Sequence, residues 1–251
     1  IDEQKSRNGK KLAADSKMVL DDKTYRTLTR KDTVGERPRL EDSPLLKELS
    51  DMVGLVQVKK AVHNLMNQQL QNYDLEMAAG DDMVPLSGSL HRLFMGNPGT
   101  GKTTVAKLYG KLLKQFGFLS DGDMITTTPS YLMGSAVGEA ATRTAEMLDM
   151  AKGKVLFIDE AYILDPQRGI SNYGQNVIDT IVEKIDAKAG ADICVILAGY
   201  RPQMEEMMRN ANNPGFKGRF NPGEALMFED FSDDDINIVL KKQEIGRASC
   251  R

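Results

Sequence analysis

The sequence predicts an α/β fold in which helices cover both faces of a parallel sheet, giving three layers. One observation is a set of short, nearly continuous apolar runs, which suit strands that are buried on both faces. These runs lie at residues 93–95, 125–128, 155–158 and 193–198. A second observation is that helical periodicity separates them, as in the stripe formed by Val177, Ile178, Ile181, Val182 and Ile185. With 251 residues, the chain is long enough to bury the core of such a sheet.

The N-terminal part of the chain divides into two segments. Within residues 1–44, 20 positions are charged, which is typical of a linker or of the tail of a preceding module. Apolar residues recur at helical spacing from Leu46 onward, on both sides of a break at Gly54. We therefore predict a folded domain over residues 45–231.

The C-terminal part is expected to be helical and then irregular. Ser232 followed by Asp235 indicates a helix N-terminus, so we predict the start of a helix over residues 232–243. Residues 244–251 depart from the periodicity of that helix, and we expect them to be a non-native tail.

Composition and charge argue against several classes of partner. The 33 basic and 36 acidic residues give a net charge of −3, which is too balanced to indicate binding to nucleic acid or to an anionic membrane. The longest strongly apolar run, 193–200, has eight residues, whereas a membrane-spanning helix needs about 20. We expect no nucleic-acid and no membrane partner. Cys194 and Cys250 cannot form a disulfide framework, and His63 and His91 complete no zinc spacing, so the cytoplasm or another reducing compartment is expected.

Residues 96–103, GNPGTGKT, match the eight-position phosphate-binding loop in the required context, after a strand and at the start of a helix. Glycines allow backbone N–H groups to face an anion because they lack a Cβ and tolerate positive φ. Lys102 is expected to reach the β- and γ-phosphates, and the Thr103 hydroxyl to bind Mg²⁺. The motif predicts a P-loop NTPase. Its expected nucleotide-binding residues are Asn97, Pro98, Gly99, Thr100, Gly101, Lys102, Thr103 and Thr104.

Two carboxylates, Asp159 and Glu160, directly follow the apolar run at 155–158. In open parallel sheets the ligand lies at the carboxyl ends of the strands, so both are expected at the nucleotide. We expect Asp159 to hold Mg²⁺ through its water shell and Glu160 to orient and deprotonate an attacking water. A small-molecule kinase needs no such water-activating base, so this pair favours hydrolysis.

Five motifs in order make the chain resemble the AAA+ ATPases, in the group that contains red-type rubisco activase and the stage V sporulation protein K. The likeness covers about residues 46–241. It implies an AAA+ large subdomain with a truncated helical lid, the use of ATP and Mg²⁺, a ring of this chain or of sister modules, and remodelling of a protein client. The motifs are the phosphate loop, FIDEAY at 157–162, YGQ at 173–175, VILAGY at 195–200 and NPGF at 213–216.

The resemblance also implies roles for residues outside the phosphate loop. Val53 and Gly54 correspond to the segment that holds the adenine ring; an ordinary helix break is the alternative. Arg219, in the sequence KGRF, corresponds to the arginine finger that enters the neighbouring subunit's site, where a guanidinium neutralises charge on the transferred phosphoryl group. A surface arginine is the alternative here.

Two positions depart from the family pattern. Many relatives end the fourth strand with a polar residue, usually Asn, that helps to position the water, and this chain has Tyr200 there. Residues 131–138 resemble the loop that lines the central pore, but Ala136 stands where relatives carry a gripping aromatic. Tyr131 and Met133 are candidates to replace it, with packing as an equal alternative.

These observations leave two hypotheses. The first is an ATPase that couples hydrolysis to remodelling of a protein partner, with rubisco regulation as one branch. Its catalytic residues are Lys102, Glu160 and Arg219, and its metal-binding residues are Thr103 and Asp159. The second, motivated by Tyr200 and Ala136, is a scaffold module that binds ATP in a tandem array without hydrolysing it. Residues 27–32 resemble the end of a preceding lid, which is consistent with such an array.

Overall fold

A computed structural model describes residues 43–79, 89–136, 138–168, 173–185 and 192–248. Five strands form one sheet in which every pairing is parallel, in the order β2-β3-β4-β1-β5. Because all strands run the same way, their carboxyl ends meet at one edge of the sheet. The strands are β1 (Arg92–Gly96), β2 (Met124–Thr127), β3 (Val155–Ile158), β4 (Cys194–Gly199) and β5 (Leu226–Phe228).

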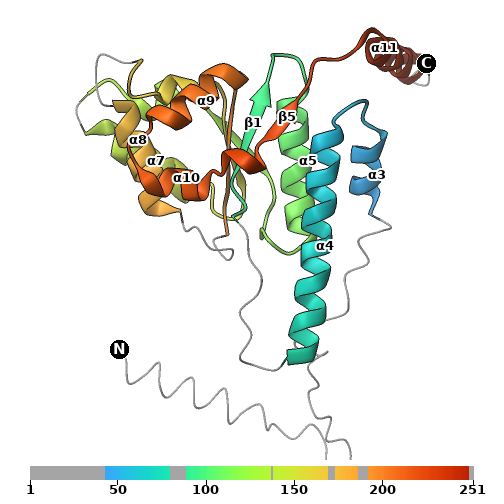
Figure 1. The fold of residues 1–251 in the computed structure, drawn as a ribbon, viewed down its shortest axis with the longest axis horizontal. Helices are drawn as coiled ribbons and strands as arrows, with labels where there is room; N and C mark the ends of the chain where they lie inside the picture. Colours follow the sequence, from blue (N-terminus) through green and yellow to red (C-terminus); the bar gives the residue numbers. More distant parts are fainter. Residues whose placement is uncertain (1–42, 80–88, 137, 169–172, 186–191, 249–251) are drawn as a thin grey trace, which may run out of the picture.

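Helices cover both faces of the sheet (Figure 1). Strand side chains alternate between two apolar clusters, so that Leu93 and Met95 belong to one cluster and Phe94 to the other. The first cluster is completed by α6 (Pro129–Met133), α7 (Glu139–Met150), α8 (Tyr173–Lys184), α9 (Arg201–Asn210) and α10 (Pro214–Arg219). The second is completed by α3 (Pro44–Asp51), α4 (Val56–Ala79) and α5 (Lys102–Gln115). The predicted three-layer α/β architecture is confirmed.

The strand predictions agree with the structure to within one or two residues at each end, and the break at Gly54 separates α3 from α4. Strand β5, which has only three residues, was not predicted. Too short to show a hydrophobic period, β5 is defined by its pairing with β1, through Phe94↔Leu226 and Gly96↔Phe228.

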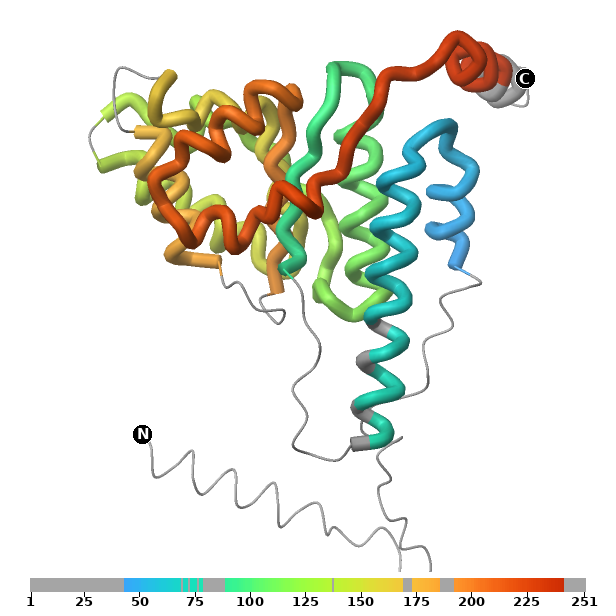
Figure 2. The backbone as a smooth tube through the Cα atoms, in the orientation of Figure 1, coloured from blue at the N-terminus to red at the C-terminus, as the bar shows by residue number. Residues whose placement is uncertain are grey.

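The C-terminal helix, α11 (Asp233–Ala248), begins where predicted and continues into the segment interpreted as a tail. The Ser232 hydroxyl accepts a hydrogen bond from the Asp235 N–H, and the Asp235 carboxylate accepts one from the Ser232 N–H, which is a reciprocal cap. In Figure 2, α11 lies away from the sheet, at the end of the segment that leaves β5. Within the described ranges, no helix is both long enough and apolar enough to cross a membrane.

Candidate nucleotide site

A cavity of about 370 Å³ opens at the carboxyl edge of the sheet, where β1, β3 and β4 lie next to one another. Each of these strands contributes its last residue or the residues that follow it. The cavity is lined by Gly96, Pro98, Gly99, Gly101, Lys102, Thr103, Thr104, Asp159, Glu160, Gly199 and Tyr200. The structure therefore brings the predicted phosphate loop and the predicted acid pair into one site.

The phosphate loop has the backbone geometry that an anion site requires. Gly99 and Gly101 adopt φ values of 78° and 92°, which L side chains rarely adopt. No other atom lies within 4 Å of a Cβ built at either position, so the reason for glycine is backbone conformation rather than crowding. Helix α5 begins at Lys102, so its unsatisfied N–H groups and the positive end of its dipole face the cavity. These features fit a phosphate group.

Lys102 places a positive charge inside this loop. Its Nζ atom donates hydrogen bonds to the carbonyl oxygens of Gly96, at 2.9 Å, and Asn97, at 2.7 Å. Partial burial lowers the pKa of Lys102, whereas the nearby Asp159 carboxylate acts to raise it. An ammonium group held beside a carboxylate, within reach of the loop, suits a phosphate–metal complex bound between them.

The acid pair is held by a strained turn. Glu160 has φ 53° and ψ 36°, a left-handed conformation that is uncommon for a residue with a side chain. Its backbone N–H donates to Oδ1 of Asp159 at 3.0 Å, so the Asp159 carboxylate is oriented by its neighbour. Asp159 is half-buried at the cavity wall and Glu160 is exposed. Strain of this kind clusters at functional sites, and here it separates the two carboxylates into different positions.

The hard-oxygen donors that magnesium prefers are present at this site. Thr103 and Asp159, the two residues predicted to bind Mg²⁺, both line the cavity. Magnesium is often held by one or two protein groups together with substrate phosphates, and this donor set fits that pattern. In the described part of the chain, no group of three or more His, Cys, Asp or Glu side chains could hold a metal by itself.

Tyr200 lies in the cavity at the end of β4, next to the acid pair. Its ring contacts the Tyr162 ring at a centroid distance of 5.7 Å. Gly199 provides the space for this pair, because a Cβ there would lie 2.9 Å from Cδ1 of Tyr162. Among the described residues, no hydrogen bond joins the Tyr200 hydroxyl to protein, which leaves that hydroxyl free to contact a ligand.

A second cavity, of about 350 Å³, adjoins the first and shares Gly101 with it. Val53 lies in its wall, as the adenine-pocket prediction requires. Gly54 does not line the cavity but lies beside Phe231, since a Cβ on Gly54 would be 4.0 Å from the Phe231 ring. A largely apolar cavity next to a phosphate loop suits a nucleotide base. Its lining residues are Glu48, Asp51, Met52, Val53, Leu55, Thr100, Gly101, Phe231 and Val239.

Two predicted loop residues occupy other positions. Asn97 does not line the first cavity; its Nδ2 donates to the Asp230 carboxylate oxygens at 3.0 and 2.8 Å. Thr100 is buried and lines the second cavity, and its hydroxyl donates to the Asn97 carbonyl at 2.7 Å. Phe231 and Val239 were missed as site residues, because a position before or within a predicted helix carries no signal for base binding.

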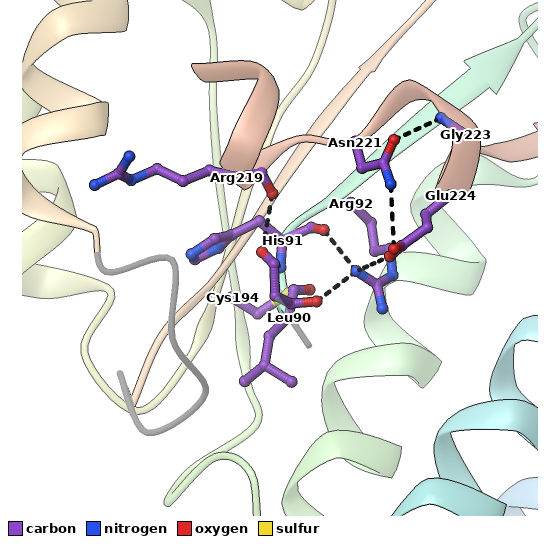
Figure 3. A network of polar contacts seen from close by, with 9 residues as sticks. Leu90, His91, Arg92, Cys194, Arg219, Asn221, Gly223 and Glu224 are labelled. Atoms are coloured by element: carbon purple, nitrogen blue, oxygen red, sulfur yellow. Dashed lines mark hydrogen bonds and ion pairs between the residues drawn. The ribbon is translucent and has the colours of Figure 1, made fainter. Parts of the chain in front are cut away.

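Arg219 lies outside both cavities. Its Nε donates to the Ile185 carbonyl at 2.6 Å and its Nη1 to the Gly215 carbonyl at 3.2 Å. The Arg219 carbonyl accepts from the Ser89 hydroxyl at 2.9 Å (Figure 3). Arg219 therefore lines neither cavity of its own chain, and two backbone carbonyls hold its guanidinium.

The same network surrounds the start of β1 (Figure 3). Arg92 forms an ion pair with Glu224 at 3.3 Å, and Nδ1 of His91 accepts from the Val195 N–H at 3.0 Å. The Cys194 thiol donates a hydrogen bond to the Leu90 carbonyl, and burial raises the pKa of Cys194 to about 12. A thiol in this state is inert at neutral pH, so Cys194 and His91 have structural roles.

Glu139 and Arg143 hold the described residues 131–136 of the segment that resembles a pore loop, whereas Val137 lies outside the described residues. Oε2 of Glu139 accepts from the Ser135 N–H at 2.9 Å and forms an ion pair with Arg143 at 3.0 Å. The Arg143 guanidinium lies over the Tyr131 ring at 5.6 Å. The Tyr131 side chain is exposed and Met133 is half-buried, so Tyr131 is the more accessible of the two.

Comparisons with known proteins agree with this geometry. Residues 92–213 match the ATPase family associated with various cellular activities (AAA). The chain is 33% identical over 201 residues to stage V sporulation protein K of Bacillus subtilis (strain 168), covering 78% of this chain and 58% of that protein. It is 40% identical over 148 residues to protein CbbX of Cereibacter sphaeroides, covering 59% of this chain and 46% of that protein. The chain thus spans about half the length of these relatives.

A solved structure shows the same fold. The FIGL-1 AAA domain in complex with ADP aligns with a TM-score of 0.51 at 19% identity, covering 78% of this chain and 60% of that one. The alignment supports the arrangement of the sheet and its helices.

Proposed function

The chain belongs to the AAA ATPase family, and we propose that it binds ATP with Mg²⁺ and hydrolyses it to ADP and phosphate. The observation that carries this proposal is the meeting of Lys102 and Glu160 in one cavity. Lys102 supplies a fixed positive charge for the phosphates, and Glu160 supplies a carboxylate within the same space. Among the described residues no side chain pairs with the Glu160 carboxylate, and an anion site that also holds such a base favours hydrolysis over simple nucleotide storage.

The reaction assigns a separate task to each group. Backbone N–H groups of the loop and the Lys102 ammonium hold the phosphates, while Thr103 and Asp159 hold Mg²⁺, which neutralises charge on the β- and γ-phosphates when bound. The Glu160 carboxylate accepts a proton from a water, whose oxygen bonds to the γ-phosphorus as the bond to the bridging oxygen breaks. Negative charge on the departing ADP is stabilised by the groups that already hold the β-phosphate.

We propose further that hydrolysis requires a second subunit. Arg219 does not line the cavity of its own chain, and its guanidinium, which donates to the Ile185 and Gly215 carbonyls, would exchange these contacts for a phosphate only in an assembly that brings it to a neighbour's site. A ring of this chain or of sister modules supplies that arrangement, and a protein client is its substrate for remodelling. We assign the chain to the cytoplasm or another reducing compartment.

Phosphate release from ATP, measured over a range of protein concentrations with Mg²⁺ or with EDTA, tests this proposal. Specific activity is expected to rise with concentration as subunits assemble, and to disappear with EDTA. Binding of ATP with Mg²⁺ but no release at any concentration would support the alternative, in which the chain is a nucleotide-binding scaffold. The exposed Glu160 carboxylate in the cavity favours the hydrolytic reading.

A further inference from the structure

The segment that leaves β5 starts beside the phosphate loop. Gly96, the last residue of β1, pairs with Phe228, the last residue of β5. A Cβ on Gly96 would lie 2.3 Å from the Phe228 carbonyl oxygen, so the two strands approach each other more closely than any side chain would permit. The phosphate loop and the β5 segment therefore leave the sheet side by side.

A side-chain contact joins these two segments just beyond the ends of β1 and β5. The Asn97 amide donates to both carboxylate oxygens of Asp230, at 3.0 and 2.8 Å. The Asn97 carbonyl accepts from Lys102 at 2.7 Å and from Thr100 at 2.7 Å. One residue thus contacts the phosphate-binding lysine, the wall of the second cavity and the β5 segment.

Asp230 is followed directly by a residue of the second cavity. Phe231 lines the second cavity together with Val53, and Val239 on α11 lines it as well. Beyond Phe231, the Ser232–Asp235 cap fixes the start of α11. Phe231 is therefore held between two anchors, one at Asp230 and the other at Ser232.

We infer that the Asn97–Asp230 contact positions Phe231 as a wall of the base pocket, so that this pair sets how strongly the chain prefers a nucleotide to its phosphate part alone. The inference rests on the proposed nucleotide binding and adds two positioning residues and one base-contacting residue to it. Asn97 and Asp230 act through Phe231, whereas Lys102 acts on the phosphates directly.

Affinities for ADP and for pyrophosphate, both with Mg²⁺, separate the two parts of the site. Calorimetric titration of the full chain gives both dissociation constants. The dissociation constant for pyrophosphate divided by that for ADP measures what the base contributes to binding. Asp230→Ala is expected to reduce this ratio about fivefold, the effect of losing one hydrogen bond. Phe231→Ala is expected to reduce it by at least as much, and the double variant no further than Phe231→Ala alone.

Glu229→Ala is the matched control, because it removes the same charge from the neighbouring exposed position. Glu229→Ala is expected to leave the ratio unchanged. Asp230→Asn retains an oxygen acceptor for Asn97, so its ratio is expected to lie close to that of the unmodified chain. Pyrophosphate binding that stays within about twofold in every variant shows that the phosphate site is intact.

Equal losses for ADP and pyrophosphate in Asp230→Ala would overturn the inference, since the pair would then act on the phosphate loop. So would a ratio in Asp230→Ala equal to that in Glu229→Ala. Equal affinities of the unmodified chain for pyrophosphate and ADP would mean that no base pocket is present, which overturns the inference alone. Binding of neither compound would overturn both the inference and the proposed function.

Discussion

The backbone N–H of Glu160 donates a hydrogen bond to Oδ1 of Asp159 at 3.0 Å, and Glu160 adopts a left-handed conformation to do so. Two consecutive carboxylates in an extended strand would point to opposite faces of the sheet. The turn instead keeps both in the cavity at different positions, one half-buried at its wall and one exposed. This is the geometric basis for assigning the metal to Asp159 and the water to Glu160.

The first prediction follows from this division. Glu160→Gln keeps the side-chain volume and removes the proton acceptor, so hydrolysis is expected to fall by about 10²- to 10⁴-fold. Affinity for ATP with Mg²⁺ is expected to stay within a few-fold, because the amide leaves the phosphate contacts in place. Phosphate release and calorimetric titration of the same preparation measure the two effects. A variant that hydrolyses ATP at the unmodified rate would exclude Glu160 as the base.

The second prediction concerns Tyr200. Tyr200 lines the cavity, and among the described residues its hydroxyl has no protein hydrogen-bond partner. Tyr200→Phe is therefore expected to lower kcat by about 10²- to 10³-fold, as loss of a transition-state donor does. Tyr162→Phe is the matched control, because Tyr162 contacts Tyr200 through its ring. It is expected to leave kcat near the unmodified value. The same kcat in both variants would mean that the Tyr200 hydroxyl takes no part.

The third prediction concerns Arg219. Arg219→Ala is expected to reduce hydrolysis by about 10³-fold in the assembled protein, the lower end of the range for arginine fingers. Lys217→Ala, an exposed base on the same helix, is the control and is expected to have little effect. Mixing Arg219→Ala with Glu160→Gln subunits should restore part of the activity, because some interfaces then combine an intact Glu160 with an intact Arg219. Absence of any recovery in co-assembled mixtures would argue against action between subunits.

The fourth prediction is about stability. Gly96→Ala places a Cβ against the Phe228 carbonyl, so the free energy of unfolding is expected to fall by about 1 to 3 kcal/mol. Gly218→Ala, in α10, meets no atom within 4 Å and is expected to raise it by about 0.4 to 1 kcal/mol. Urea unfolding followed by circular dichroism measures both. Equal stability of the two variants would show that β1 and β5 are not as closely packed as described.

The sequence was sufficient to predict the central part of the site, because local pattern determines it. A glycine-rich loop between a strand and a helix, and acids at the end of an apolar run, identified Lys102, Thr103, Asp159 and Glu160 as parts of one site. Parallel strands bring their carboxyl ends to one edge whatever the intervening loops are, so the strand pattern was enough to bring these residues together.

Other parts depend on contacts that local pattern does not encode. The Asn97–Asp230 contact joins residues 133 positions apart, and neither residue type indicates the other. The β5 strand exists through its pairing with β1, and Phe231 reaches the second cavity because that strand ends beside the phosphate loop. Arg219 was assigned by resemblance, and the structure adds that its guanidinium is held by the Ile185 and Gly215 carbonyls.

The most direct test of the central claim is the affinity for ADP with Mg²⁺ in the unmodified chain and in Lys102→Ala, measured by calorimetric titration. Removal of the ammonium group that faces the phosphate loop is expected to weaken binding by about 10- to 100-fold, the value of a charge-assisted hydrogen bond. Equal affinities in the two proteins would contradict the assignment of this cavity as a nucleotide site.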